Sequence, residues 1–184
     1  MAKEIERKWM PANVPAFVFD YPHKEVVQGY MNTDPVLTLE GQKKWLASIQ
    51  ANSDVKYWII EIDGMPAGVV NIVGLDREDG KMTWAYYVGE KSLRSFKTAL
   101  NLEMSMYEHV LVKLNRASVM SDVFSLNKGV IALHEYCGCE VIEEKKNAVC
   151  KNDVWYDVTY MIMTREHWMD FRKGVEFDMI DFGD

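Results

Sequence analysis

The sequence predicts a mixed α/β fold, in which helices flank both faces of a central sheet of about six to seven strands. Aromatic and β-branched runs around an Asp-Gly turn signal indicate three consecutive antiparallel strands between residues 57 and 88. A long amphipathic helix then leads to a later strand, and such a crossover permits parallel pairing in part of the sheet. With 184 residues, of which 48% are hydrophobic, the chain is expected to form one domain over 1–184.

The first 35 residues are expected to form an irregular N-terminal arm. Prolines at positions 11, 15, 22 and 35 interrupt it, and no periodicity runs through it, so at most one short strand is expected, at 17–19. After the arm, Thr38 is a good helix N-cap, and Trp45, Leu46 and Ile49 follow at helical spacing. A helix over 39–51 is therefore predicted.

The central strands are predicted at 57–62, 67–73 and 82–88, with turns at 63–66 and near 79–80. The polar, basic loop at 90–97 follows them. It precedes the main helix, whose apolar residues recur at i, i+4 and i+7 on one face and are Leu100, Met104, Tyr107, Leu111 and Leu114. His109 falls between these positions and is expected on the helix surface.

The rest of the chain supplies shorter elements. A strand is predicted at 117–123, a helix over 127–136 that Gly138 stops, and two further strands within 140–164. The last segment, 165–184, is acidic and amphipathic. It is expected to cover either an edge strand or a dimer partner, and the sequence favours neither, so a homodimer stays open.

Charge and hydropathy exclude several classes of partner. The net charge of −7 argues against nucleic acid, which is held by clustered Lys and Arg. No run approaches the roughly 18 to 20 apolar residues that a membrane helix requires, and the first residues lack the apolar middle of a signal peptide. A soluble, cytoplasmic protein without a membrane partner is expected.

The cysteines indicate neither a disulfide framework nor a metal site. There are three of them, an odd number, at 137, 139 and 150. Cys137 and Cys139 together with His134 could ligate a metal, but metal sites usually have a wider Cys-x-x-Cys spacing and a second ligand pair. No metal is expected.

Four local motifs stand out along the chain. Three are Gly29-Tyr30-Met31 with Leu37-Thr38-Leu39-Glu40, Tyr57-Trp58-Ile59-Ile60 running into Ala67-Gly68-Val69-Val70-Asn71, and Ala85-Tyr86-Tyr87-Val88-Gly89. The fourth is an Asn, a ring side chain seven residues later and a Gly eleven residues after the Asn, here Asn127, His134 and Gly138. With the order of elements, they resemble the GNAT acyltransferase superfamily from about residue 29 to 168, and within it the amino-sugar N-acetyltransferases of pseudaminic acid synthesis and flagellin modification.

This resemblance implies the GNAT fold and an acetyl-CoA-dependent N-acetyltransferase. The primary amine of a small acceptor, by preference an amino sugar or its nucleotide, would attack the thioester directly, with no covalent enzyme intermediate. A polyamine, an aminoglycoside or a protein N-terminus stays open as the acceptor. The alternatives are a catalytically degenerate GNAT-like domain that binds a small molecule or a partner, and a purely structural module.

The phosphate-binding loop that the resemblance implies departs from the family pattern. Family members carry an Arg or Gln followed by two glycines, whereas this loop has no glycine after Gly89. Because glycine lets a backbone approach phosphates closely, side chains are expected to compensate. The candidates are Lys91, Ser92, Arg94, Ser95 and Lys97. A solvated charged loop is the alternative, and the resemblance favours phosphate binding.

The resemblance also implies roles on the strand at 82–88. Its backbone at Tyr87 and Val88 would contact the acyl and pantetheine units, while Tyr86 faces the other way from Tyr87. Thr83 stands where many members carry a carboxylate base, so a water chain held by Thr83 and Asn71 is expected instead. Residues implied to contact the acceptor are Tyr30, Asn71, Trp84 and Tyr86. Core packing is the alternative for the tryptophans at 58 and 84.

For the acid that protonates the thiolate, the motif selects His134. Helix geometry gives His134 and Tyr136 different directions, about 200° apart, so only one can face the thiolate. A structural histidine is the alternative. Asn127 is implied to contact the cofactor, and a plain helix N-cap is its alternative role.

Overall fold

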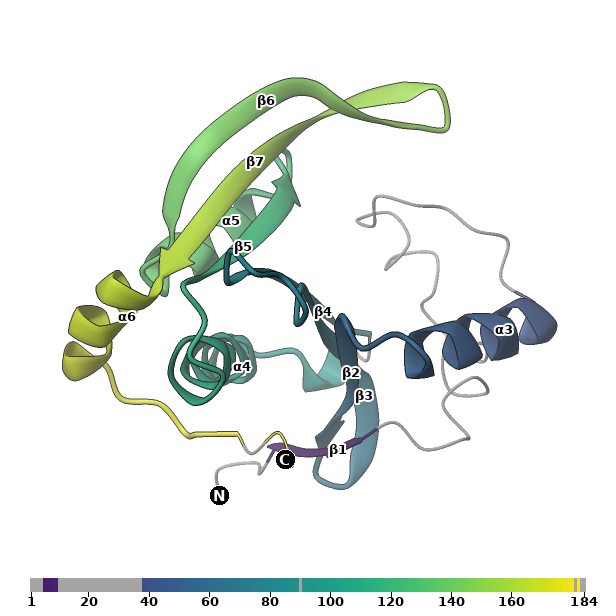
Figure 1. Cartoon of the computed structure of the whole chain (residues 1–184), viewed down its shortest axis with the longest axis horizontal. Helices are drawn as coiled ribbons and strands as arrows, with labels where there is room; N and C mark the ends of the chain where they lie inside the picture. Colours follow the sequence, from purple (N-terminus) through teal and green to yellow (C-terminus); the bar gives the residue numbers. More distant parts are fainter. Residues whose placement is uncertain (1–4, 10–37, 90, 181, 183–184) are drawn as a thin grey trace.

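The computed structural model describes residues 5–9, 38–89, 91–180 and 182, and these form one seven-stranded sheet flanked by helices (Figure 1). The strand order is β1-β2-β3-β4-β5-β7-β6. The strands are β1 (Ile5–Trp9), β2 (Val55–Ile62), β3 (Met65–Val73), β4 (Lys81–Val88), β5 (Ser118–Phe124), β6 (Glu140–Lys151) and β7 (Val154–Thr164). The predicted mixed sheet of six to seven strands is confirmed.

Three helices lie where periodicity and capping signals predict them, and they are α3 (Leu39–Gln50), α4 (Phe96–Tyr107) and α5 (Lys128–Tyr136). A fourth helix, α6 (Arg165–Phe171), lies in the acidic segment for which no helix was predicted. Short 3-10 turns cover Lys91–Leu93 and Arg172–Gly174, and a π-helical segment, η2 (Glu108–Lys113), continues α4. Thr38 caps α3 as expected, since its Oγ1 accepts a hydrogen bond from the Gly41 amide at 3.0 Å.

Pairing along the sheet is antiparallel except between β4 and β5. Asp63 and Gly64 form a two-residue turn with φ of 52° and 74°, which suits the twist of the β2–β3 hairpin. β3 therefore already begins at Met65, inside the longer turn that the sequence indicated.

β1 corrects the prediction of an irregular arm over residues 1–35. Its five residues pair with β2 from Ile5–Ile62 to Trp9–Trp58. The strand is created by pairing with an available sheet edge, and a tertiary contact of this kind leaves little local signal in five residues. The short strand expected at 17–19 lies outside the described residues.

Opposite faces of β2 pack against different helices. Leu46 of α3 forms a small cluster with Ile59, whereas Trp58 and Ile60 on the other face join the main core with Leu102 of α4. Figure 1 shows α3 and α4 on opposite sides of β2 to β4. Since side chains alternate along a strand, β4 divides in the same way, with Trp84 and Tyr86 toward the main core and Thr83 toward the α3 face.

The C-terminal segment, of which residues 175–180 and 182 are described, runs back across α4 and closes the main core. Ile180 donates its amide to Ser105 Oγ at 2.9 Å, and both Ile180 and Phe182 are buried. The Phe182 carbonyl accepts a hydrogen bond of 2.8 Å from the Trp58 indole. This part of the segment 165–184 therefore covers the helix-packed core.

A second correction concerns two residues of the π-helical segment η2. His109 was expected on the helix surface but is 1% exposed, and its ring stacks on Phe182 with centroids 4.3 Å apart. Glu108 beside it is also buried, and it pairs with Arg172 at 2.7 Å and accepts from the Trp168 indole. Both residues are buried because the C-terminal elements cover a side of the helix that its apolar periodicity predicts to be exposed.

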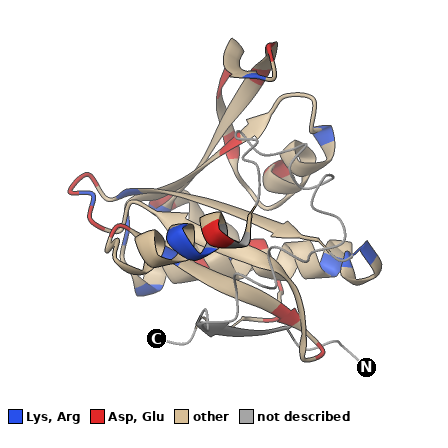
Figure 2. Ribbon diagram, turned by 90° about the vertical axis from the view of Figure 1, so that its right-hand side faces the viewer, with Lys and Arg blue, Asp and Glu red and all other residues tan. Residues whose placement is uncertain are grey.

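Charged residues of both signs are interspersed over the described helices, loops and hairpin ends (Figure 2). The β6–β7 hairpin extends beyond the rest of the sheet (Figure 1). None of the helices that the structure describes combines the length and apolar character that a membrane span requires.

Candidate functional site

The site begins where β4 and β5 separate. Their parallel ladder contains only three residue pairs and ends at Thr83–Met120. Beyond that point β4 continues to Val88 along β3, and β5 continues to Phe124 along β7. The backbone of residues 84–88 is therefore not paired with β5, and the sheet is split along its middle.

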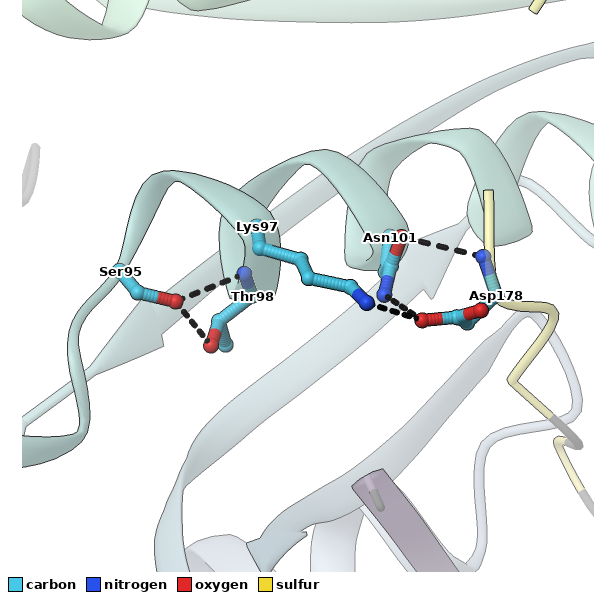
Figure 3. Close-up of polar contacts among 5 residues, drawn as sticks. All are labelled: Ser95, Lys97, Thr98, Asn101 and Asp178. Atoms are coloured by element: carbon cyan, nitrogen blue, oxygen red, sulfur yellow. Dashed lines mark hydrogen bonds and ion pairs between the residues drawn. The ribbon is translucent and has the colours of Figure 1, made fainter. Parts of the chain in front are cut away.

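The loop after β4 leads directly to the first turn of α4. Ser95 is the N-cap of this helix, with its Oγ accepting from the Thr98 amide at 3.0 Å (Figure 3). The Arg94 guanidinium donates from Nε to the Val88 carbonyl at 2.7 Å and from Nη2 to the Gly89 carbonyl at 3.0 Å. Of the predicted loop residues, Ser95 thus caps α4, and Arg94 holds the end of β4 through its hydrogen bonds to these two carbonyl groups.

Lys97 makes an ion pair on the first turn of α4. Its Nζ lies 2.8 Å from Asp178 Oδ2 of the C-terminal segment, and Asn101 donates to the same oxygen (Figure 3). The hydrogen bond from Lys97 holds the pKa of Asp178 below its usual range. Both side chains are more than half exposed, and an exposed pair of this kind is weak enough for a phosphate group to displace.

His134 lies on the buried side of α5, and Tyr136 lies on the exposed side. His134 is 4% exposed and Tyr136 is 62% exposed, so the structure separates them as the helix geometry predicts. The Tyr136 ring contacts the exposed ring of Phe96 edge-on, at 5.2 Å between centroids. The His134 ring instead lies 6.0 Å from Trp84 of β4, beneath the split.

His134 is bound to a carboxylate that the sequence analysis missed. Its Nδ1 lies 2.5 Å from Oε1 of Glu103, a completely buried residue of α4, and the Tyr107 hydroxyl donates to the same oxygen. A signal for Glu103 exists in the sequence. Glu103 stands three residues after Leu100 and four before Tyr107, so it is a charged residue on the apolar face of the main helix.

Phenols and thiols surround the Glu103 carboxylate and keep their protons. Burial, with the Glu103 charge as a smaller cause, raises the pKa of Tyr86 and of Tyr107 far above the ordinary value. Desolvation and Glu103 raise the pKa of Cys137 likewise, and burial raises the pKa of Cys139 to about 12. Protonated groups therefore lie near Glu103, and the Tyr107 hydroxyl and His134 Nδ1 bond to its Oε1.

Thiol labelling tests this arrangement directly. Cys150 is exposed, whereas Cys137 and Cys139 are buried, and a thiol reacts as its thiolate. At pH 8 we expect Ellman's reagent to titrate one thiol in the folded protein and three after denaturation. A Cys150→Ser variant provides the control and should show none before denaturation. Rapid labelling of two or more thiols in the folded protein would contradict the buried cluster.

The motif glycine ends α5 and orients the following residues. Gly138 has φ of 87°, its amide donates to the Glu135 carbonyl, and the Cys139 amide donates to the His134 carbonyl at 2.9 Å. A Cβ at Gly138 would also lie 2.8 Å from the Phe171 ring. Asn127 is the N-cap residue of α5 and its carbonyl accepts from the Val130 and Ile131 amides, although its side chain makes no capping hydrogen bond.

The other predicted site residues divide between the two faces of the sheet. Trp84 is buried in the main core and Tyr86 stacks on it at 5.3 Å, so the core alternative holds for Trp84 and also for the completely buried Trp58. Asn71 and Thr83 lie on the opposite face, the one that α3 covers. The exposed side chains of Lys91 and Ser92 lie between β4 and α4. Tyr30 lies outside the described residues.

Val88 and Tyr87 end β4 opposite Gly68 and Val69 of β3. Val88 packs against the main core, and Tyr87 points to the other face, as the alternation predicts. Among the described residues no group of three or more His, Cys, Asp or Glu side chains could hold a metal ion.

Comparisons with known proteins agree with this arrangement. The model of the acetyltransferase (GNAT) domain family matches residues 16–160. No curated protein matches the sequence. A spermidine N-acetyltransferase from Vibrio cholerae, solved with CoA and spermine, is 12% identical with a TM-score of 0.81, over 90% of this chain and 98% of that one.

Further structures of the Vibrio cholerae enzyme give similar values. A chimera with the human enzyme is 14% identical over 90% of this chain and 98% of that one, with a TM-score of 0.80. A dodecameric form is 11% identical over 90% and 96%, with a TM-score of 0.76. At these identities the likeness shows the fold alone. The family match, which spans most of the chain, shows that this protein belongs to the GNAT acetyltransferase family.

Proposed function

We propose that this protein transfers an acetyl group from acetyl-CoA to the primary amine of a small acceptor, by direct attack of the amine on the thioester. The separation of β4 from β5 beyond Thr83 carries this proposal. A thioester lying in the split would contact β4 backbone groups, with the ring of His134 below it. Holding both reactants in one geometry supplies much of the rate enhancement that an acyl transfer requires.

The start of α4 fits the pyrophosphate of CoA. The first amides of a 12-residue helix point toward the loop and favour an anion, and Lys91 and Lys97 add positive charge on either side of Ser95. Arg94 has a different part in this proposal. Because it holds the carbonyls of Val88 and Gly89, it keeps the end of β4 in place beside the ligand.

Two classes of acceptor are favoured within this proposal, while an aminoglycoside and a protein N-terminus stay open. The sequence motifs favour an amino sugar or its nucleotide, whereas the structural neighbours acetylate spermidine, as their names state. Both present a primary amine, and the chemistry at the thioester is the same. A catalytically degenerate domain, the second candidate function, is favoured by the lack of glycine in the loop after Gly89.

Calorimetry with acetyl-CoA tests the cofactor part. We expect micromolar binding, and binding about tenfold weaker with dephospho-CoA, because the 3′-phosphate adds a charged contact. Lys97→Ala should also weaken acetyl-CoA about tenfold, which corresponds to about 1.4 kcal/mol. Lys44→Ala is the matched control, since Lys44 is another exposed lysine in an ion pair, on α3. Equal binding by wild type and Lys97→Ala would remove Lys97 from the cofactor site.

An acceptor panel then separates enzyme from degenerate domain. Release of free CoA thiol would be measured with spermidine, with amino sugars and their nucleotides, and with an aminoglycoside. Turnover of one class identifies the acceptor. Binding of acetyl-CoA without turnover on any of these amines would favour the degenerate domain, and absence of binding would reject the acetyltransferase.

A further inference from the structure

Two donors converge on one oxygen of the buried Glu103. Oε1 accepts from the Tyr107 hydroxyl and lies 2.5 Å from Nδ1 of His134, and the side chains of Glu103 and His134 are 0% and 5% exposed. The raised pKa of Tyr107 keeps its phenol protonated, so Tyr107 is the donor. An oxygen with two such neighbours is an acceptor, and a buried carboxylate requires donors of this kind.

The geometry therefore fixes the tautomer of His134. Nδ1 carries the hydrogen that faces Glu103, and Nε2 of the neutral ring is left as a proton acceptor. Once Nε2 has taken a proton, the carboxylate stabilises the resulting cation through a charge-assisted hydrogen bond. A histidine held in this way can take a proton in one step and return it in the next.

The placement of the candidate residues on two faces of the sheet favours such a histidine. Thr83 and Asn71, the residues that the sequence suggested for a water-mediated base, lie on the α3 face, whereas His134 contacts the core face of β4 through Trp84. A base on one face and an acid on the other would each need its own exchange with solvent. One imidazole below the split serves both steps, because the nitrogen and the sulfur are bonded to the same carbon of the tetrahedral intermediate.

We propose that Glu103 and His134 form one proton-transfer unit that replaces the separate base and acid, an inference that rests on the proposed acetyl transfer. The acceptor nitrogen bonds to the thioester carbon while the carbonyl π pair moves to oxygen, and the N–H proton of the nitrogen moves to Nε2 of His134. The oxygen pair then re-forms the carbonyl as the C–S bond breaks and its electron pair goes to sulfur. Nε2 returns the same proton to sulfur, which gives the CoA thiol and the amide. His134 is the catalytic residue, and Glu103, which orients its ring, is a positioning residue.

Steady-state kinetics on three variants test this unit. We expect Glu103→Gln to lower kcat about 100-fold with KM changed less than about twofold, and His134→Gln to do the same. The double variant should be no worse than His134→Gln, because residues that act as a unit are not additive. A Glu103→Gln enzyme with wild-type kcat, or a double variant about 10,000-fold impaired, would overturn the proposal.

Glu108→Gln is the matched control. Glu108 is the other buried carboxylate on the same continuous helix, but it bonds to Arg172 and Trp168 away from His134. Its replacement should lower the melting temperature and leave kcat within about twofold. A loss of kcat equal to that of Glu103→Gln would show that removing any buried carboxylate from this helix has the same effect, and would overturn the specific role of Glu103.

Nitrogen NMR needs no acceptor, and the His134→Gln variant assigns the His134 resonances among those of the four histidines. With 15N-labelled histidine, we expect the His134 ring to carry its proton on Nδ1 at neutral pH, and CoA to shift the Nε2 resonance while desulfo-CoA does not. A proton on Nε2 in the free protein, or equal shifts with both ligands, would overturn the proposal. A protein that binds neither ligand would reject the proposed function instead, and the tautomer would still decide whether Glu103 orients His134.

Discussion

Gly68→Val should lower the free energy of unfolding by about 3 kcal/mol or more, the largest effect on stability that we expect from a single added side chain. A Cβ at Gly68 would lie 1.9 Å from the Tyr87 carbonyl oxygen and 2.9 Å from the Val88 Cα. Both are backbone atoms of β4, so no side chain can turn away to make room. β3 and β4 would have to separate where β4 enters the proposed thioester site.

Urea denaturation followed by circular dichroism measures this loss, and calorimetry should show a melting temperature lower by about 10 °C. Gly129→Ala is the matched control, because a Cβ at Gly129, near the start of α5, would meet no atom within 4 Å. That change should be neutral or stabilise the protein by up to about 1 kcal/mol. If Gly68→Val were equally harmless, the close approach of β3 and β4 would be wrong.

Trp58→Ala should cost about 3 to 5 kcal/mol and release the C-terminal segment from the core. Trp58 is completely buried, its indole donates to the Phe182 carbonyl at 2.8 Å, and its ring meets the Phe182 ring edge-on at 5.0 Å. Truncation leaves a large cavity and an acceptor without its donor. Hydrogen exchange should therefore become faster over 175–182 as well as in β2.

Two further variants separate the loss of the hydrogen bond from the loss of the buried ring. Trp58→Phe keeps most of the ring and loses the hydrogen bond, so it should cost about 1 to 2 kcal/mol. Trp155→Ala removes a tryptophan that is 60% exposed on β7 and should change the free energy of unfolding by less than about 0.5 kcal/mol. Equal losses from Trp58→Ala and Trp155→Ala would contradict the burial of Trp58 and the role of the segment 175–182.

Local signals in the sequence predicted most of the fold. The cap at Thr38, the left-handed turn at Asp63-Gly64 and the alternation of Met82, Trp84 and Tyr86 with their neighbours all act over a few residues. Helix periodicity likewise predicted that the side chains of His134 and Tyr136 point in different directions. Each of these features depends on backbone preferences or on one apolar face, which a single sequence contains.

The features that could not be predicted depend on contacts between distant parts of the chain. β1 forms because β2 offers an edge, and Lys97 pairs with Asp178 because the C-terminal segment returns across α4. His109 is buried because that segment ends on it with Phe182. The pairing of Glu103 with His134 joins positions 31 residues apart, and no periodicity connects them.

The short β4–β5 ladder also makes a weak connection between the two halves of the sheet. Three residue pairs join β1–β4 to β5–β7–β6, whereas β2 and β3 are joined by eight. Because so few backbone hydrogen bonds join β4 to β5, the relative twist of the two halves of the sheet depends on the side chains that pack across this boundary. These include Glu103 of α4 and His134 of α5, which bond to each other. A molecule that fills the opening would supply the missing cross-links, and its binding would then stiffen both halves of the sheet together.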